Sequence, residues 1–395
     1  MASVVLKPGR DKSIIRRHPW IFSGALAEVR GAPADGETVA VLSSQGECLA
    51  KGAYSSTSQI RVRIWSWDPD EEIGPDFIRE RISKSIRRRV GCVDPAQTDA
   101  FRLVHAESDG LPGLIVDRYR DVLVMQCLSW GIERWRETLV EALVELTGLN
   151  CVYERSDVEV RALEGLEARS GPLRGGTPPE RLKISEFGID YWVDVQRGQK
   201  TGFYLDQRAN RKTVRQLANG REVLDCFAYT GGFTLAALKG GAKKSLCIEA
   251  SAEAIELGRE NADLNEVNPS DVNWIQGNVF QEMRKLRDQG RSFDLVILDP
   301  PKFAATAAQA QRAARGYKDI NLLGFKLLRP GGILATFSCS GGVDAGLFQK
   351  ILSGAALDAG VEARIIQKLS QDCDHPVALN FPEGAYLKGL ILYVE

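Results

Sequence analysis

From about residue 184 onward, short apolar runs alternate with longer amphipathic stretches. The apolar runs, each of which predicts a buried strand, are EVLDCF, SLCIEA, VNWIQGNVF, FDLVILDPP and GGILATFSC. The stretches with helical character lie at 231–239, 251–266, 280–288, about 307–328 and 343–358. Strands that alternate with helices form a mostly parallel sheet with helices on both faces. The pattern therefore predicts an α/β domain over residues 184–395.

Two further patterns flank this alternation. The segment KISEFGIDYWVDV, which begins at Lys183, predicts a hairpin in front of the first parallel strand. The segments RIIQKLSQ and GLILYVE at the other end predict two edge strands, of which the last is antiparallel. The expected sheet is thus parallel except at one edge.

The first part of the chain has a different pattern. Residues 1–70 alternate short apolar runs with Gly, Pro and Asp, which predicts a small all-β domain. Residues 75–182 predict a mixed α+β domain, with helices over 75–92 and 131–147. The Gly/Pro-rich stretch 170–182 predicts a loop or domain boundary.

Composition and charge narrow the class of protein. The chain has 395 residues, of which 44% are hydrophobic and 26% charged, as in ordinary globular proteins. Its net charge of -1 excludes a strongly basic, histone-like protein. Residues 1–67, however, hold nine Lys/Arg and five Asp/Glu, so this part is basic. No run approaches the roughly 18 apolar residues of a membrane span, and we expect a cytoplasmic protein.

The cysteines and histidines do not form a metal or disulfide pattern. The 8 cysteines include no CxxC pair, and there are only 3 histidines. This spacing argues against a zinc site and against a disulfide framework. We therefore expect no metal, and most thiols to be small core residues.

Polar residues and glycines follow the first three predicted parallel strands. The first strand ends in Asp225-Cys-Phe-Ala-Tyr-Thr-Gly-Gly, and the second in Glu249, at the distance that suits a ribose diol. The absence of GxGxxG favours S-adenosylmethionine over a nicotinamide dinucleotide. After the third strand, Asn278 is equally compatible with an adenine contact and with an ordinary helix N-cap.

The next two strand ends carry candidate chemistry. Asp299-Pro300-Pro301-Lys302-Phe303 predicts a rigid loop in which the carboxylate accepts a bond from an exocyclic amine and a planar base packs on the prolines and Phe303. The alternative is a plain strand-ending turn. Cys339 follows the fifth strand, where a thiol with a lowered pKa would be a strong nucleophile. The alternative, an inert core cysteine, is equally compatible with the local sequence.

These motifs together resemble class I S-adenosylmethionine-dependent RNA methyltransferases. The chain is most similar to the bacterial 23S ribosomal RNA 5-methylcytosine methyltransferase family over nearly its full length. The segments that carry the likeness are Asp225–Gly232, Asp299–Lys302, Ser338-Cys339-Ser340, Gln199–Arg208, Phe381–Lys388 and His105–Gly113. His18-Pro-Trp-Ile-Phe22 resembles the start of that family's PUA domain, a small RNA-binding β-barrel. The resemblance implies a Rossmann-like methyltransferase domain behind a PUA barrel and a middle domain.

The resemblance also implies a role for each candidate residue. The residues expected to hold S-adenosylmethionine are Asp225, Phe227, Tyr229 and Gly231 as its lining, Glu249 at the ribose, Asn278 at the adenine, and Tyr204, Asp206 and Arg208 at the methionine end. Asp299 would contact the cofactor and the target base, with Pro300, Pro301, Lys302 and Phe303 around the base. Cys339 matches the nucleophile and would act alone, since no cysteine lies in 299–303.

The implied activity is methylation of carbon 5 of a cytosine in 23S ribosomal RNA through a covalent cysteine adduct. The implied partner is that RNA, bound in part by the basic N-terminal domain, and a homodimer is compatible with such a domain. The basic run 81–89 would contact phosphates or form a solvated helix face. The rival readings are a related guanine methyltransferase, a non-catalytic RNA-binding protein and a nucleotide-dependent oxidoreductase.

Overall fold

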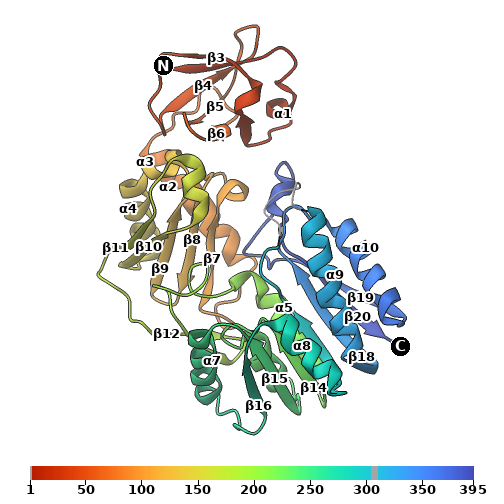
Figure 1. The fold of residues 1–395 in the computed structure, drawn as a ribbon. Helices are drawn as coiled ribbons and strands as arrows, with labels where there is room; N and C mark the ends of the chain where they lie inside the picture. Colours follow the sequence, from red (N-terminus) through yellow and green to blue (C-terminus); the bar gives the residue numbers. More distant parts are fainter. Residues whose placement is uncertain (1, 304–309) are drawn as a thin grey trace. The chain divides into compact units, whose positions relative to one another are not determined.

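The computed structural model describes residues 2–303 and 310–395 (Figure 1). The chain forms two compact units, each made of several segments. The first contains Met1–Ile184, Val193–Leu205 and Cys373–Gly384, and the second contains Ser185–Trp192, Asp206–Asp372 and Ala385–Glu395. The division into domains at 1–70, 75–182 and 184–395 stays a prediction from the sequence.

The first unit begins with a six-stranded sheet in the order β2-β6-β5-β4-β1-β3. Its strands are β1 (Ser3–Leu6), β2 (Trp20–Phe22), β3 (Leu26–Arg30), β4 (Thr38–Leu42), β5 (Cys48–Tyr54) and β6 (Ile60–Ser66), with the short helix α1 (Lys12–Ile15) after β1. Val4, Val39 and Val62 are fully buried in its core. The predicted all-β character is confirmed, although β1, α1 and most of β3 were not predicted.

A five-stranded sheet in the order β11-β10-β9-β8-β7 follows in the same unit. Its strands are β7 (Ala100–His105), β8 (Leu114–Tyr119), β9 (Val122–Cys127), β10 (Cys151–Ser156) and β11 (Arg169–Arg174), and its helices are α2 (Pro75–Val90), α3 (Trp130–Arg134) and α4 (Arg136–Thr147). The stretch 170–182, predicted as a loop or domain boundary, is a strand in its first part, because β11 pairs with β10. As an edge strand, β11 tolerates Pro172, which lacks a backbone donor.

The second unit is built on a seven-stranded sheet in the order β16-β15-β14-β17-β18-β20-β19. Its strands are β14 (Glu222–Cys226), β15 (Lys244–Glu249), β16 (Val272–Gln276), β17 (Phe293–Leu298), β18 (Leu328–Ser338), β19 (Ala363–Leu369) and β20 (Lys388–Val394). Strands β14 to β18 pair in parallel, and β20 is antiparallel to both of its neighbours. The antiparallel last strand is confirmed. Of the two strands predicted to be edges, β19 is one, whereas β20 lies inside the sheet.

Helices cover both faces of this sheet, as predicted. They are α5 (Arg208–Leu217), α6 (Gly232–Lys239), α7 (Ala252–Leu264), α8 (Val279–Asp288), α9 (Ala310–Lys326) and α10 (Ala345–Ala359). Alternate strand residues face opposite cores: Leu224 packs in the cluster that contains residues of α8, α9 and α10, whereas Val223 packs in the cluster that contains residues of α5 and α6. Residues 307–309 of the helix predicted at 307–328 lie outside the described residues.

The remaining strands are β12 (Leu182–Glu186) and β13 (Ile189–Val193), which pair as the predicted hairpin. No helix among the described residues is both long and apolar enough to cross a membrane.

Candidate functional site

Five parallel strands of the second unit end at the same edge of the sheet. Cys226 pairs with Leu298, and Leu298 with Thr336, so the last residues of β14 and β17 are level with one another. Strand β18 runs two residues farther, to Ser338, at the same edge. This edge is where ligands bind in open α/β sheets. The side chains that follow the strand ends are those that the sequence singled out.

The loop after β14 is tightly wound. Phe227, Tyr229 and Gly231 all have positive φ angles, of 62°, 48° and 82°. Such angles are uncommon for residues with a side chain and mark a backbone that its surroundings hold in place. A Cβ atom on Gly231 would stand 3.2 Å from the Trp274 ring, so a side chain there would require the ring to shift as well as strain the backbone.

Glu249 holds this loop against β15. Its carboxylate accepts hydrogen bonds from the backbone N–H groups of Tyr229 at 2.9 Å, Ala250 at 2.7 Å and Ser251 at 3.0 Å. An ionised carboxylate offers about four acceptor positions, so a diol can still be bound. The contact also explains how the two strand ends are kept in register.

Asp225 is almost fully buried and its carboxylate accepts a bond of 2.7 Å from the Thr234 hydroxyl in α6. Burial raises the pKa of Asp225 to about 7, and the negative charges of Asp299 and Glu249 add to the rise, against the lowering effect of the Thr234 bond. Three carboxylates therefore lie near one another at this edge. Such a group favours a ligand that carries positive charge, as a sulfonium and an ammonium do.

Asn278 caps the helix that begins after β16. Its side-chain oxygen accepts from the backbone N–H of Gln281 at 3.3 Å, and the side chain is exposed. The structure therefore contains the helix N-cap that the sequence allowed for Asn278, and the adenine contact stays a prediction.

The Asp-Pro-Pro loop is held from two sides. Gln207 Nε2 donates to Asp299 Oδ2 at 3.0 Å, and the backbone N–H of Phe303 donates to Ser340 Oγ at 3.1 Å. The Phe303 ring lies 4.8 Å from that of Tyr317 in α9 and 6.1 Å from that of Phe280. Pro300 is buried, whereas the other two residues between Asp299 and Phe303, Pro301 and Lys302, are exposed.

Cys339 comes directly after β18, at the carboxyl edge of the sheet, and is half-buried. It packs against the core cluster that contains Phe337 and Leu387, so it lies at the margin of the core. The next residue, Ser340, is fully buried, and its Oγ is 3.0 Å from the Tyr317 hydroxyl. Since Ser340 also binds Phe303, the segment with the cysteine and the Asp-Pro-Pro loop are joined through one hydroxyl.

Residues expected at the methionine end are divided between the units. Asp206 accepts 2.7 Å from the Tyr386 hydroxyl, and Arg208 pairs with Asp372 at 2.8 Å, all four in the second unit. Tyr204 belongs to the first unit, where the Lys200 ammonium lies 4.4 Å from its ring centroid. The assignment of these residues to the cofactor stays a prediction.

The sequence analysis gave no individual role to Gln207, Ser340 or Lys388, although they lie in segments that carry the family resemblance, and it did not single out Tyr317. Gln207 and Ser340 adjoin residues that were singled out, and their side chains are polar yet buried. That combination becomes a signal only once burial is known, because buried polar groups need partners.

Other groups that the sequence singled out are used for structure. In the run 81–89, Arg81 pairs with Glu71, Arg87 with Glu80, and Arg88 and Arg89 with Asp109. Arg89 is only 2% exposed. These internal partners favour a structural role for the run over phosphate contact.

One group among the described residues has metal-ligand spacing. It consists of Cys127, Glu133 and Glu154, whose ligand atoms lie within 4.8 Å of one another. Arg161 pairs with Glu133 at 3.0 Å, and Arg136 pairs with Glu133 as well. The two arginines therefore already supply this group with the positive charge that a metal ion would bring.

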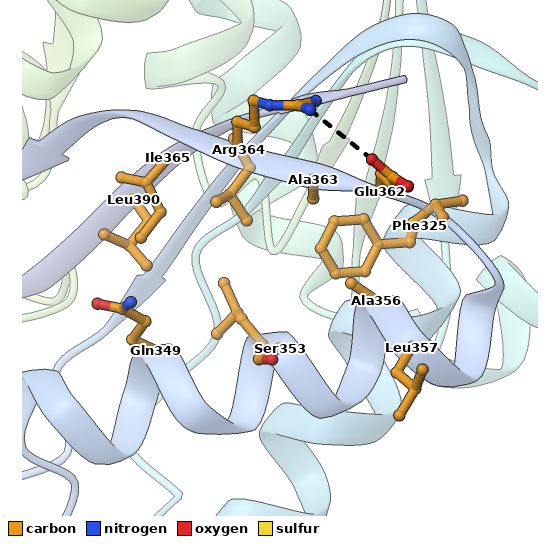
Figure 2. A pocket seen from close by; sticks show the side chains of 13 residues that line it. Phe325, Gln349, Ser353, Ala356, Leu357, Glu362, Ala363, Arg364, Ile365 and Leu390 are labelled. Atoms are coloured by element: carbon orange, nitrogen blue, oxygen red, sulfur yellow. Dashed lines mark ion pairs between the residues drawn. The ribbon is translucent and has the colours of Figure 1, made fainter.

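A hollow of about 460 Å³ lies between α10 and β19, where Figure 2 shows Phe325, Ser353 and Ile365 around it. Its lining is mostly apolar, apart from residues such as Arg364, which pairs with Glu362 at 3.7 Å. Since β19 runs in the same direction as β18 and the hollow adjoins its first residues, it lies at the edge opposite to the cysteine. We assign it no part in the site.

Comparisons with known proteins bear on the fold and the cofactor. The family profile for S-adenosylmethionine-dependent methyltransferases matches residues 168–369, and that for the PUA-like domain matches residues 4–67. These matches confirm the expected cofactor and the PUA-like N-terminal part.

Full-length relatives are also found. Ribosomal RNA large subunit methyltransferase I of Aeromonas hydrophila is 48% identical over 392 residues, with 99% of either chain covered. The protein of the same name from Shewanella amazonensis is 49% identical over 391 residues, again with 99% of either chain covered. A solved structure described as a SAM-dependent methyltransferase from Streptococcus mutans is 20% identical, with a TM-score of 0.86 and 100% of both chains covered, which confirms the fold.

Proposed function

We propose that this chain, which belongs to the ribosomal RNA large subunit methyltransferase I family, methylates carbon 5 of a cytosine in 23S ribosomal RNA. The observation that carries the proposal is the place of Cys339, half-buried at the carboxyl edge of the sheet and joined through Ser340 to the Asp-Pro-Pro loop. A ribosomal substrate also implies a cytoplasmic enzyme.

The chemistry needs a nucleophile because carbon 5 of cytosine is itself a poor one. The Cys339 thiolate adds its electron pair to carbon 6, and the electrons of the carbon 5–carbon 6 double bond become available at carbon 5. S-adenosylmethionine, when bound, would supply an electrophilic methyl group for that carbon, with a neutral thioether as the leaving group. A base takes the carbon 5 proton, and the electrons of that C–H bond restore the double bond as the sulfur leaves with its own bonding pair.

Asp299 supports these steps by its position. A carboxylate there can accept from the exocyclic amine of the base and stabilise charge that builds up on the ring. The hydrogen bond from Gln207 fixes one of its oxygens, so the group is oriented before the substrate arrives. The target nucleotide has to leave its stack to reach such an edge.

A surface of the first unit suits single-stranded RNA. A hollow of about 420 Å³ is lined by Arg10, Ser13, His18, Trp20, Ile21, Phe22, Gly24, Ala25 and Glu383. Phe22 is 50% exposed, although it is a large aromatic residue. Exposed rings beside basic residues stack bases and attract phosphates. We infer that this surface holds RNA outside the target nucleotide.

The test is methylation of ribosomal RNA from a strain that lacks the protein, with labelled S-adenosylmethionine and mapping of the modified base. Cys339→Ala is expected to bind S-adenosylmethionine normally and to lose methylation, whereas Cys92→Ala, which changes an exposed cysteine, is expected to keep it. A methylated guanine would establish the rival activity. Activity in Cys339→Ala would refute the covalent mechanism.

A further inference from the structure

The antiparallel strand β20 begins where β18 ends. The register pairs Ser338, the last residue of β18, with Lys388, the first residue of β20. A parallel neighbour would have its carboxyl end here instead. Because β20 runs opposite to β18, its first residue, Lys388, lies at the same edge of the sheet as Cys339.

The Lys388 side chain is held in place. Its Nζ donates to the backbone carbonyls of Ser340 and Tyr386, each at 2.8 Å, and the residue is half-buried. An ammonium has three N–H donors, and these two bonds leave a third for another acceptor. One of the two carbonyls belongs to the residue directly after Cys339, so the cation is fixed beside the cysteine by the backbone.

Several charged groups surround these two residues. Burial lowers the pKa of Lys388, the nearby Cys339 and Asp344 raise it, and Lys302 lowers it further. Tyr317 of α9 faces Cys339 and Asp299, and burial raises its pKa, so its hydroxyl is neutral at neutral pH. Around the sulfur, Asp299 and Asp344 therefore oppose a negative charge, and the two lysines favour it.

Of the two lysines, Lys388 is the better placed to act. Lys302 is exposed in the Asp-Pro-Pro loop, where water screens its charge. Lys388 is partly desolvated and its ammonium is held by two hydrogen bonds, so its field at the sulfur is stronger and constant.

We propose that Lys388 is a positioning residue that stabilises the thiolate of Cys339 and so keeps the nucleophile ready for attack. The inference rests on the proposed function, which supplies the role of the cysteine. In the step concerned, the thiol loses its proton to solvent, the sulfur keeps the electron pair, and Lys388 stays protonated throughout.

The test measures the thiol itself. The full-length protein is alkylated with iodoacetamide between about pH 5.5 and 9.5, and the rate at Cys339 is followed by peptide mass spectrometry. We expect Lys388→Met to raise the midpoint of the rate profile by about one pH unit. Alkylation at pH 7 then falls about tenfold. Lys388→Arg, which keeps the charge, is expected to restore most of the shift.

The controls separate charge from structure. Lys368→Met changes an exposed lysine on β19 and is expected to leave the midpoint unchanged. If Lys388 has a purely structural role, its substitution changes the plateau rate at high pH and leaves the midpoint unchanged, and that result would overturn the inference. An equal shift of the midpoint in the Met and Arg variants would overturn it as well. Lys388→Gln serves as a second neutral variant if the Met variant does not fold, and S-adenosylmethionine binding verifies folding.

Failure of the inference can be distinguished from failure of the proposed function. Methylation by Cys339→Ala would refute the covalent mechanism, whatever the alkylation profiles show. An unchanged midpoint in both neutral variants, together with an inactive Cys339→Ala, would refute only the role of Lys388.

Discussion

The side-chain amide of Gln207 donates a hydrogen bond of 3.0 Å to Oδ2 of Asp299. Gln207 is itself oriented, because Asn210 Nδ2 donates to its Oε1 at 2.6 Å and to the Ser370 carbonyl at 3.0 Å. The residue directly before α5 thus aims the carboxylate that follows β17. Asp299 is oriented by amides that come from a different part of the chain.

This relationship predicts graded effects on turnover. Asp299→Ala is expected to lower kcat by about a hundredfold, because a charge-stabilising group is lost. Gln207→Leu removes the orienting bond, together with the bond from Asn210, but leaves the carboxylate in place, and it is expected to cost about tenfold. S-adenosylmethionine affinity, measured by calorimetry, should change much less in both. Gln281→Leu is an exposed control. Equal losses of affinity and turnover would point to a structural role for Asp299.

The buried carboxylate of Asp225 predicts a pH-dependent stability. Burial raises its pKa to about 7, above the roughly 3.9 of an unfolded chain, so the folded state holds a proton that the unfolded state releases in between. The free energy of unfolding should therefore fall as pH rises from about 4 to 7. Asp225→Asn still accepts a hydrogen bond from Thr234 but cannot titrate. In urea titrations its free energy of unfolding should therefore fall less over this pH range than that of the wild type. Parallel pH profiles of the two proteins would contradict the assignment.

The buried pair of Arg89 and Asp109 predicts a large effect on stability. Burial alone would raise the pKa of Asp109, but the bonds and charge of Arg89, with the N–H of His105, outweigh it and hold the pKa below its usual value. Arg89→Met should lower the free energy of unfolding by about 3–5 kcal/mol, because a buried charge loses its main partner. Arg88→Met, at the exposed arginine on the same carboxylate, should cost less than about 1 kcal/mol.

The pair of Arg89 and Asp109 also predicts how the free energy of unfolding changes with pH. Because the folded pKa of Asp109 is depressed, its contribution is complete above the unfolded value and is lost as pH falls through the folded value. Urea titrations in the acid range should show the wild type losing its advantage over Arg89→Met. An advantage that grows as the pH falls would contradict this account.

The aromatic surface of the first unit predicts weaker RNA binding when it is truncated. Phe22→Ala should weaken binding about tenfold with an unchanged salt dependence, since stacking carries no charge. Arg10→Ala should instead reduce the slope of log affinity against log salt by about one. Leu357→Ala, at a residue that is 80% exposed in α10, is the control. Filter binding at several salt concentrations measures all three.

Much of the second unit could be predicted because its signals are local. Strands β14, β15, β17 and β18 are largely buried apolar runs, and the loops that follow the parallel strands carry glycine, proline or polar residues, so strand ends and the site edge follow from the sequence. The order of strands depends on pairing between distant segments, which is why the place of β20 inside the sheet was missed.

The partners of polar side chains could not be predicted from the sequence either. Nothing near Arg89 in sequence indicates that Asp109 neutralises it, so a buried ion pair and a solvated basic face look alike. Asn278 satisfies the rules for a helix cap and for a ligand contact, and only coordinates show that the cap is made. Short elements such as β1 carry too few residues for a periodic pattern.

The direction of β20 has a consequence for how variants are interpreted. The sulfur and the lysine beside it are separated in sequence by a whole helix and an edge strand, and only the docking of β20 between β18 and β19 brings them together. A lesion in α10 or β19 that loosens this docking would therefore appear in an activity assay as a chemical defect, although it lies far from any reacting atom. Inherited or engineered changes across 345–369 are best screened for thiol reactivity before they are classed as folding mutants.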